Sequence, residues 1–207
     1  MNGIDTSHHN GSIDWHKVAA NTNYKVDFCI MKATEGTGYI DPMVKTNALA
    51  TAVVGIPTGY YHFADLNGGD VVADATAQAN HFLSTLKSQP LPDASLPYIL
   101  DIEKNAGGLS KDQVLLWINT FFGVWTSAGA TNFWIYSYAS FLNENLPADH
   151  GLGNIPLWIA AYVNASEPTL PIGWNDYIAW QFRQDGSVDG ITGNVDSNIF
   201  KGTLNPA

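Results

Sequence analysis

Short apolar runs alternate with amphipathic helical patterns along this chain. The runs predict eight strands, at residues 3–5, 28–32, 59–63, 96–100, 133–136, 157–160, 179–182 and 195–198. Segments of helical periodicity lie between the early strands, whereas the late connections are rich in proline, glycine and aspartate. Strands interleaved with helices favour an α/β fold, and eight of them favour a (β/α) barrel with an irregular second half over an open sheet.

Capping residues set the predicted helix boundaries. Asp14 is expected to cap a helix that places Trp15, Val18 and Ala19 on one face. Asp41 and Pro42 are expected to open a helix that runs to about residue 54. A third helix is predicted over residues 71–87, and a capping box of Ser110 and Gln113 predicts a fourth that stops near residue 129.

Two carboxylates follow the fourth predicted strand, in the stretch Leu100-Asp101-Ile102-Glu103. On an extended backbone, residues i and i+2 face the same way with Cα atoms about 6.6 Å apart, so Asp101 and Glu103 must repel each other. Like charges in a partly dry site raise one pKa, which predicts a protonated acid beside a carboxylate. Taken alone, the pair more often represents two solvated acids at a strand end.

Other polar residues occupy the ends of the remaining strands. Reacting groups in barrels lie at the carboxyl ends of the strands. Those ends carry Asp5, Lys32, Tyr61, His62, Asp101, Glu103, Tyr136, Trp180, Gln181 and Asp196. Four acids with aromatic side chains at one rim favour a sugar-cleaving site, because aromatic faces cover sugar rings while a carboxylic acid protonates the glycosidic oxygen. Trp15, Trp117, Trp125 and Trp134 are expected to be core residues.

Composition narrows the class of protein. The chain has 207 residues with 45% hydrophobic content, a size that fits one domain. Its net charge of −10 argues against nucleic-acid binding, and no apolar run is long enough to cross a membrane. The start of the chain has no basic and apolar leader pattern. The single cysteine, Cys29, excludes an intrachain disulfide and is expected to be buried.

Alternative chemistries lack their motifs. The six histidines show no HExxH or His-x-His spacing, so no metal site is predicted. A GxSxG nucleophile elbow is absent, and so are the GxGxxG and GxxxxGK phosphate loops. No cofactor is therefore expected.

Seven short segments in order along the chain resemble glycoside hydrolase family 25, the Chalaropsis-type lysozymes or N-acetylmuramidases. They are residues 3–15 (Gly-Ile-Asp-Thr-Ser through Ile-Asp-Trp), 32–36 (Lys-Ala-Thr-Glu-Gly), 59–64 (Gly-Tyr-Tyr-His-Phe-Ala), 100–103 (Leu-Asp-Ile-Glu), 157–162 (Leu-Trp-Ile-Ala-Ala-Tyr), 180–181 (Trp-Gln) and 195–198 (Val-Asp-Ser-Asn). Each is weak alone, whereas the series in register is specific. Ser197 and Phe182 depart from residues frequent in the family, and neither change affects the four acids.

The resemblance implies a flattened, irregular barrel over residues 1–207 that cleaves the β-1,4 bond from N-acetylmuramic acid to N-acetylglucosamine. It implies that Glu103 is the general acid and that Asp101 stabilises the transition state or orients the substrate's N-acetyl group. Asp5 and Asp196 match the flanking acids, and Tyr61, Tyr136, Trp180 and Gln181 match positions that line the cleft. The partner is bacterial peptidoglycan, and a monomer without a separate wall-binding domain is expected.

Two other functions stay open from the sequence. One is a chitinase-like glycosidase, although this chain has Asp101-x-Glu103 where such enzymes carry a longer DxxDxDxE series. The other is a barrel that binds cell walls without turnover. The setting is open as well: a phage endolysin made in the host cytoplasm and a secreted enzyme whose leader has been removed both fit.

Overall fold

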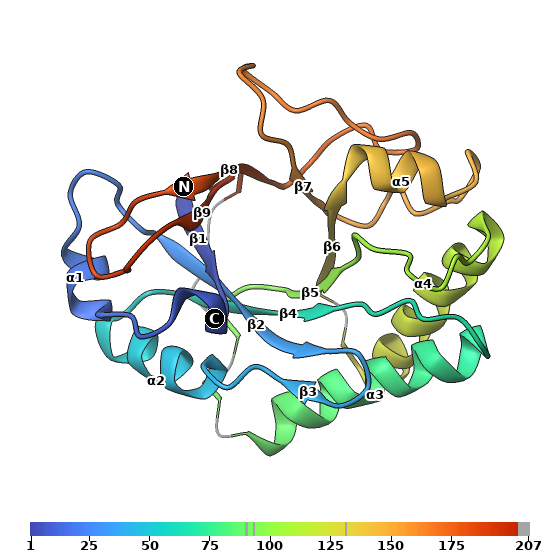
Figure 1. Cartoon of the computed structure of the whole chain (residues 1–207), viewed down its shortest axis with the longest axis horizontal. Coiled ribbons are helices and arrows are strands. Elements are labelled where there is room, and N and C mark those ends of the chain that lie inside the picture. Colours follow the sequence, from blue (N-terminus) through green and yellow to red (C-terminus); the bar gives the residue numbers. More distant parts are fainter. Residues whose placement is uncertain (90, 93, 131, 203–207) are drawn as a thin grey trace.

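The computed structural model describes residues 1–202 except 90, 93 and 131 (Figure 1). Its strands are β1 Asn2–Thr6, β2 Phe28–Glu35, β3 Tyr39–Ile40, β4 Thr58–Phe63, β5 Tyr98–Asp101, β6 Phe133–Tyr138, β7 Leu157–Ala160, β8 Ala179–Gly186 and β9 Val195–Phe200. Its helices are α1 Trp15–Ala20, α2 Val44–Val54, α3 Val71–Ser88, α4 Lys111–Ser127 and α5 Ala139–Asn145, with a short 3-10 helix η1 at His8–Asn10. All eight predicted strands are present.

The strands close into a barrel. Their order is β1-β9-β8-β7-β6-β5-β4-β2-β3, and a parallel pairing of β1 with β2 closes the ring. Seven strands of the ring run parallel to their neighbours among themselves: β1, β2, β4, β5, β6, β7 and β8. The strand β9 is antiparallel to both β8 and β1. β3 is a two-residue addition, antiparallel to the end of β2, and was not predicted because two residues carry no periodic pattern. The α/β barrel is confirmed.

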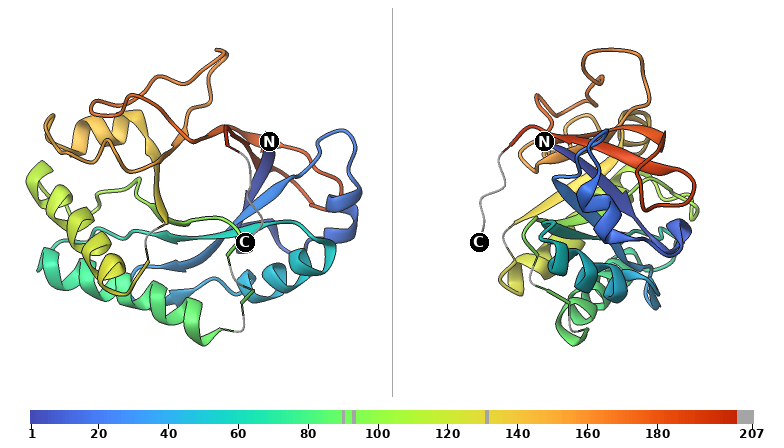
Figure 2. Two further views of the ribbon diagram at one scale, coloured as in Figure 1. Left: turned by 180° about the vertical axis from the view of Figure 1, so that it is seen from behind. Right: turned by 90° about the vertical axis from the view of Figure 1, so that its left-hand side faces the viewer.

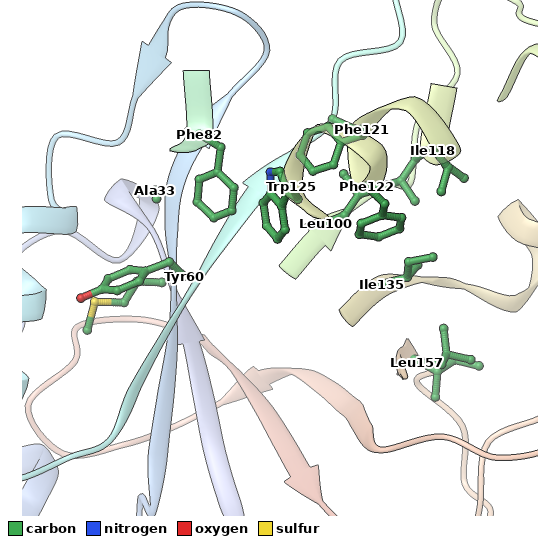
Figure 3. Packing of buried hydrophobic residues seen from close by; sticks show 14 of the residues in the cluster. Ala33, Tyr60, Phe82, Leu100, Ile118, Phe121, Phe122, Trp125, Ile135 and Leu157 are labelled. Carbon is green, nitrogen blue, oxygen red and sulfur yellow. The ribbon is translucent and has the colours of Figure 1, made fainter. Parts of the chain in front are cut away.

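Side chains alternate between the inside of the barrel and the layer under the helices. The inner cluster includes Phe28, Ile99, Trp134 and Phe200, and Gly3 leaves space for the Phe28 ring, which a Cβ atom would overlap. The outer cluster packs strands against α3 and α4. Figure 3 shows Phe82 of α3 and Phe121, Phe122 and Trp125 of α4 above Leu100 and Ile135. This alternation decides which rim residues can reach the inside.

The helices cover the barrel unevenly (Figures 1 and 2). α2, α3 and α4 follow one another along the side formed by β2, β4 and β5. The described part of the β7–β8 connection, residues 161–178, contains no helix and extends as a long loop. The irregular second half is therefore confirmed.

Three helix predictions need correction. Ala19 of α1 is exposed, although Asp14 caps the helix through the backbone N–H of Lys17 as expected. α2 begins at Val44, because the Asp41 carboxylate accepts from Met43 in a turn before the helix. α5 follows β6 directly and has no side-chain cap at Tyr138, so the sequence carried no start signal for it. The capping box of Ser110 and Gln113 is confirmed at the start of α4.

Candidate active site

One pocket of about 470 Å³ at the rim of the barrel holds all four predicted acids. Asp5 lies in β1, Asp101 ends β5, and Glu103 follows two residues later in the connection to α4. Asp196 lies at the beginning of β9, not at a strand's carboxyl end as the sequence reading assumed. It reaches the same rim because β9 is antiparallel, which sets Asp196 directly opposite Asp5.

Asp5 is held by a network of hydrogen bonds from four strands, β6 to β9, and from the connection after β7. Its Oδ2 accepts from Gln181 Nε2 and from Asn198 Nδ2, both at 2.8 Å. Tyr136 and Tyr162 donate their hydroxyls to Gln181 Oε1 at 2.8 and 2.6 Å. Trp158 Nε1 donates to Asn198 Oδ1 at 2.8 Å. Each amide is therefore fixed at both ends, and Asp5 is presented in one orientation.

Asp101 and Glu103 differ in their surroundings. Asp101 is 6% exposed, and its Oδ1 has no hydrogen-bond partner among the described residues. Burial, followed by the charge of Glu103, raises the pKa of Asp101 well above its ordinary value. Glu103 is half-buried and accepts a hydrogen bond from Tyr138. Burial raises its pKa, while the charge of Lys104 opposes the rise.

These directions correct one expectation. The general-acid role that the family resemblance implies for Glu103 assigned the resting proton to Glu103 and the charge to Asp101. The structure raises the pKa of both acids and raises that of Asp101 further, because Asp101 is the more deeply buried and has an oxygen without a donor among the described residues. The two acids influence each other's titration, so a proton in the cleft belongs to the pair and not to one acid alone.

Asp5 and Asp196 form a second coupled pair. Burial raises the pKa of Asp196 to about 8, and the charge of Asp5 adds to that rise. Burial also raises the pKa of Asp5, against hydrogen bonds from Asn198, Gln181 and Asp196. A hydrogen bond between two carboxyl groups needs a proton, and the raised pKa of Asp196 favours Asp196 as its donor and Asp5 as the acceptor.

The proton on Asp196 predicts a pH dependence of stability. An acid whose pKa is raised on folding contributes stability that is complete below its ordinary value of 3.8 and is lost as pH rises through about 8. Asp196→Asn is therefore expected to gain in melting temperature, relative to the unchanged protein, as pH rises from about 4 to about 8, and to keep a constant advantage above that. Buried His62, whose pKa is lowered to about 3, is present in both proteins, so its own titration cancels in the difference.

Calorimetric melting at several pH values measures this difference. Asp149→Asn, at an exposed position outside the pocket, is the matched control and should run parallel to the unchanged protein. A constant difference across this pH range for Asp196→Asn would contradict the assignment of the proton.

The predicted cleft residues divide into two groups. Tyr61, Tyr136 and Gln181 line the pocket as expected. Trp180 does not: Gln181 faces the inside, so its neighbour in the strand must face outward, where Trp180 Nε1 donates to Ala161 O at 2.8 Å. His62 is also outside the pocket, buried between Thr34 and Gln78 under α3.

Trp158, Tyr138 and Tyr162 line the pocket and were not predicted to do so. A signal was available for Tyr138, which lies two residues after Tyr136 and therefore on the same face of β6. Trp158 was hidden because its strand, β7, is buried on both sides and shows no alternation. Tyr162 lies beyond the end of β7 in an irregular connection.

The two tryptophans give a matched test of the pocket. Trp158→Phe removes the donor that orients Asn198 toward Asp5, so we expect kcat/KM to fall about three- to tenfold, as for one lost hydrogen bond. Trp180→Phe removes a comparable bond to Ala161 O and should lower the melting temperature while kcat/KM stays within twofold. Equal losses of activity in the two variants would contradict the placement of Trp180 outside the site.

Within the part of the chain that the structure describes, no group of three or more His, Cys, Asp or Glu side chains is arranged to hold a metal ion. None of the described helices is long and apolar enough to cross a membrane.

A buried and a half-buried acid in one aromatic-lined pocket are typical of a glycoside hydrolase site. One carboxyl group can protonate the leaving oxygen while the other stabilises positive charge on the sugar. Comparison with known proteins agrees. The family described as Glycosyl hydrolases family 25 matches residues 4–191. The chain belongs to this family. Asp196 and Asn198 lie beyond the matched range, and the geometry of β9 places both at the site.

Relatives extend over nearly the whole chain. Lysozyme M1 of Streptomyces globisporus is 35% identical over 98% of this chain and 68% of its own length. The N,O-diacetylmuramidase of Chalaropsis sp. is 27% identical over 95% of this chain and 96% of its own. The crystal structure of the bacterial lysozyme from Streptomyces coelicolor superposes with a TM-score of 0.85 at 34% identity, covering 98% of this chain and 93% of that one. The protein is thus a peptidoglycan hydrolase of the lysozyme class.

Proposed function

We propose that this chain is an N-acetylmuramidase that cleaves the β-1,4 bond between N-acetylmuramic acid and N-acetylglucosamine, with Glu103 as the general acid. The observation that carries the proposal is the position of Glu103. It is half-buried at the pocket with a raised pKa, next to a more deeply buried acid. A carboxyl group that is both reachable and protonated can donate to the glycosidic oxygen.

Asp101 is proposed to act on the substrate from the buried side of the pocket. Its Oδ1 is buried without a donor among the described residues, which costs free energy unless a ligand supplies the donor. The N–H of a substrate acetamido group is such a donor. Bound in this way, Asp101 orients the N-acetyl group or stabilises the oxocarbenium-like transition state, and the acetamido N–H favours its charged form.

Three courses of the reaction stay open for Asp101. A direct attack by Asp101 suits carboxyl groups about 5 to 5.5 Å apart, whereas an activated water suits a wider gap. Participation by the substrate's own N-acetyl oxygen also needs no close approach by Asp101. The stereochemistry of the product, followed by NMR at early times, separates inversion from retention.

Asp5, Asp196 and the aromatic residues are proposed to shape the site around the reacting bond. Asp5 and Asp196 hold one proton between them on the wall formed by β1 and β9. Tyr61, Tyr136 and Gln181 line the pocket, and Tyr136 and Gln181 also belong to the network that fixes Asp5. Their proposed task is to position the sugar against Glu103.

Digestion of purified sacculi tests the proposal. Mass spectrometry of the borohydride-reduced products should show N-acetylmuramitol as the new reducing end. N-acetylglucosaminitol would contradict the proposed bond, and no release of reducing ends would favour a barrel that binds walls without turnover. Faster cleavage of chitin oligosaccharides than of peptidoglycan would favour the chitinase-like alternative.

The setting follows from the substrate. We propose that the protein acts on the bacterial cell wall as a single catalytic domain over residues 1–207 and works as a monomer. A phage endolysin and a secreted enzyme both meet that description.

A further inference from the structure

Both signs of charge line the pocket. Asp5 and Asp196 lie on the wall from β1 and β9. Lys32 from β2 and Lys104 from the connection after β5 also line the pocket, and both approach Phe63 at the end of β4. The two Nζ atoms lie 4.7 and 5.0 Å from the centre of the Phe63 ring, which holds both cations by cation–π contact.

The two lysines differ in what neutralises them. Lys32 is buried and forms an ion pair with Glu35, which also lines the pocket. Lys104 is exposed, and among the described residues no carboxylate lies within ion-pair distance of it. Lys104 is therefore a cation of the pocket that can still pair with an anionic ligand. It follows the proposed general acid, Glu103, directly in the sequence.

A positive charge at this place opposes the character of the rest of the protein. The net charge is −10, so a negatively charged substrate is repelled by most of the surface that it approaches. Neutral polysaccharides would gain little from a lysine here. A glycan that carries carboxylates would gain an attractive contact on a protein that otherwise repels it.

We propose that Lys104 forms an anion subsite that binds a carboxylate on the muramyl substituent of the glycan and so favours muramyl substrates over neutral ones. The inference rests on the muramidase function proposed above and deepens it. The carboxylate belongs either to a free lactyl group on peptide-free strands or to the stem peptide where the lactyl group is amidated.

Lys104 has a second effect that the test must separate. Its charge opposes the rise in the pKa of Glu103, so its removal alters general-acid catalysis on every substrate. A ratio of kcat/KM between charged and neutral forms of one glycan cancels that effect, because both forms use the same Glu103.

The first experiment compares peptide-free glycan strands with free lactyl carboxylates against the same strands after reduction of those carboxylates to alcohols. The second compares muropeptide oligomers with free stem carboxylates against their amidated forms. In one of the two comparisons, Lys104→Gln should lower the charged-to-neutral ratio about fivefold, as for one partly exposed ion pair. That comparison identifies the source of the carboxylate. Lys104→Arg should retain the ratio, and Lys45→Gln, an exposed lysine on α2, is the matched control.

An unchanged ratio in both comparisons would overturn the inference, even if Lys104→Gln slows all substrates equally, because Lys104 would then act only through Glu103. Failure of the underlying function looks different. In that case the unchanged protein would not produce muramitol ends from sacculi at all.

Discussion

Glu103→Gln is expected to lower the rate of cell-wall lysis by about 10²–10⁴-fold while the fold stays intact. The substitution keeps the size of the side chain and removes the proton that the glycosidic oxygen must receive, and general acids contribute rate factors of this order. Glu103 lies after the end of β5, half-buried, and its partner Tyr138 can also donate to an amide oxygen. Local structure should therefore survive.

Lysis of purified walls, followed by turbidity and by release of reducing ends, measures the loss. Thermal unfolding should show a melting temperature no lower than that of the unchanged protein, because a half-buried acid with a raised pKa has been replaced by a neutral group. Glu144→Gln, at an exposed position on α5, is the control and should retain full activity. Lysis within tenfold of normal by Glu103→Gln would remove Glu103 from the role of general acid.

The eight strands were predictable because each is a short apolar run bounded by turn residues, and the helices between the early strands favour parallel pairing there. The reversal of β9 was not predictable from its pattern. No helix joins β8 to β9, and their antiparallel pairing forms a hairpin-like turn through residues 187–194. The structure places Asp196 at the rim, although not for the reason that the sequence suggested: the strand runs the other way, and the residue lies at its start.

The sequence did not determine which of two neighbouring residues in a strand faces the cleft. Trp180 and Gln181 were both predicted to line the site, although neighbours in a strand face opposite sides. The structure assigns Gln181 to the inside, bonded to Asp5, and Trp180 to the outside. Trp158 shows the converse, since a strand buried on both faces gives no sign of which side is the cleft. Tertiary contacts decided these cases.

The proton distribution was the least predictable feature. Spacing alone placed Asp101 and Glu103 on one face and required that one pKa rise. Which of the two pKa values rises further depends on how deeply each carboxyl group is buried and on which groups donate hydrogen bonds to it. Neither property can be predicted from the sequence. Asp101 is the deeper acid and lacks a donor at Oδ1, while Glu103 has Tyr138 and the opposing charge of Lys104.

Asp101→Asn is the second substitution with a large expected effect, a loss of about 10²–10³-fold in kcat. A buried charge that faces the developing oxocarbenium ion acts as electrostatic stabilisation, and the loss of one such group costs this much. The amide has the same shape, so the pocket should stay intact. Stability relative to the unchanged protein should increase as pH rises above 4, because the acid that resists ionisation in the folded state is gone.

A paired substrate experiment shows how Asp101 acts. If Asp101 orients the acetamido group, the unchanged enzyme should lose most of its rate on de-N-acetylated glycan, and Asp101→Asn should lose little more on that glycan, because both changes break the same contact. If Asp101 stabilises the sugar cation directly, the two losses should multiply. A loss of less than tenfold in Asp101→Asn on the acetylated glycan would contradict both roles. The second carboxylate would then be Asp5 or Asp196, which the antiparallel β9 holds opposite each other at the same rim.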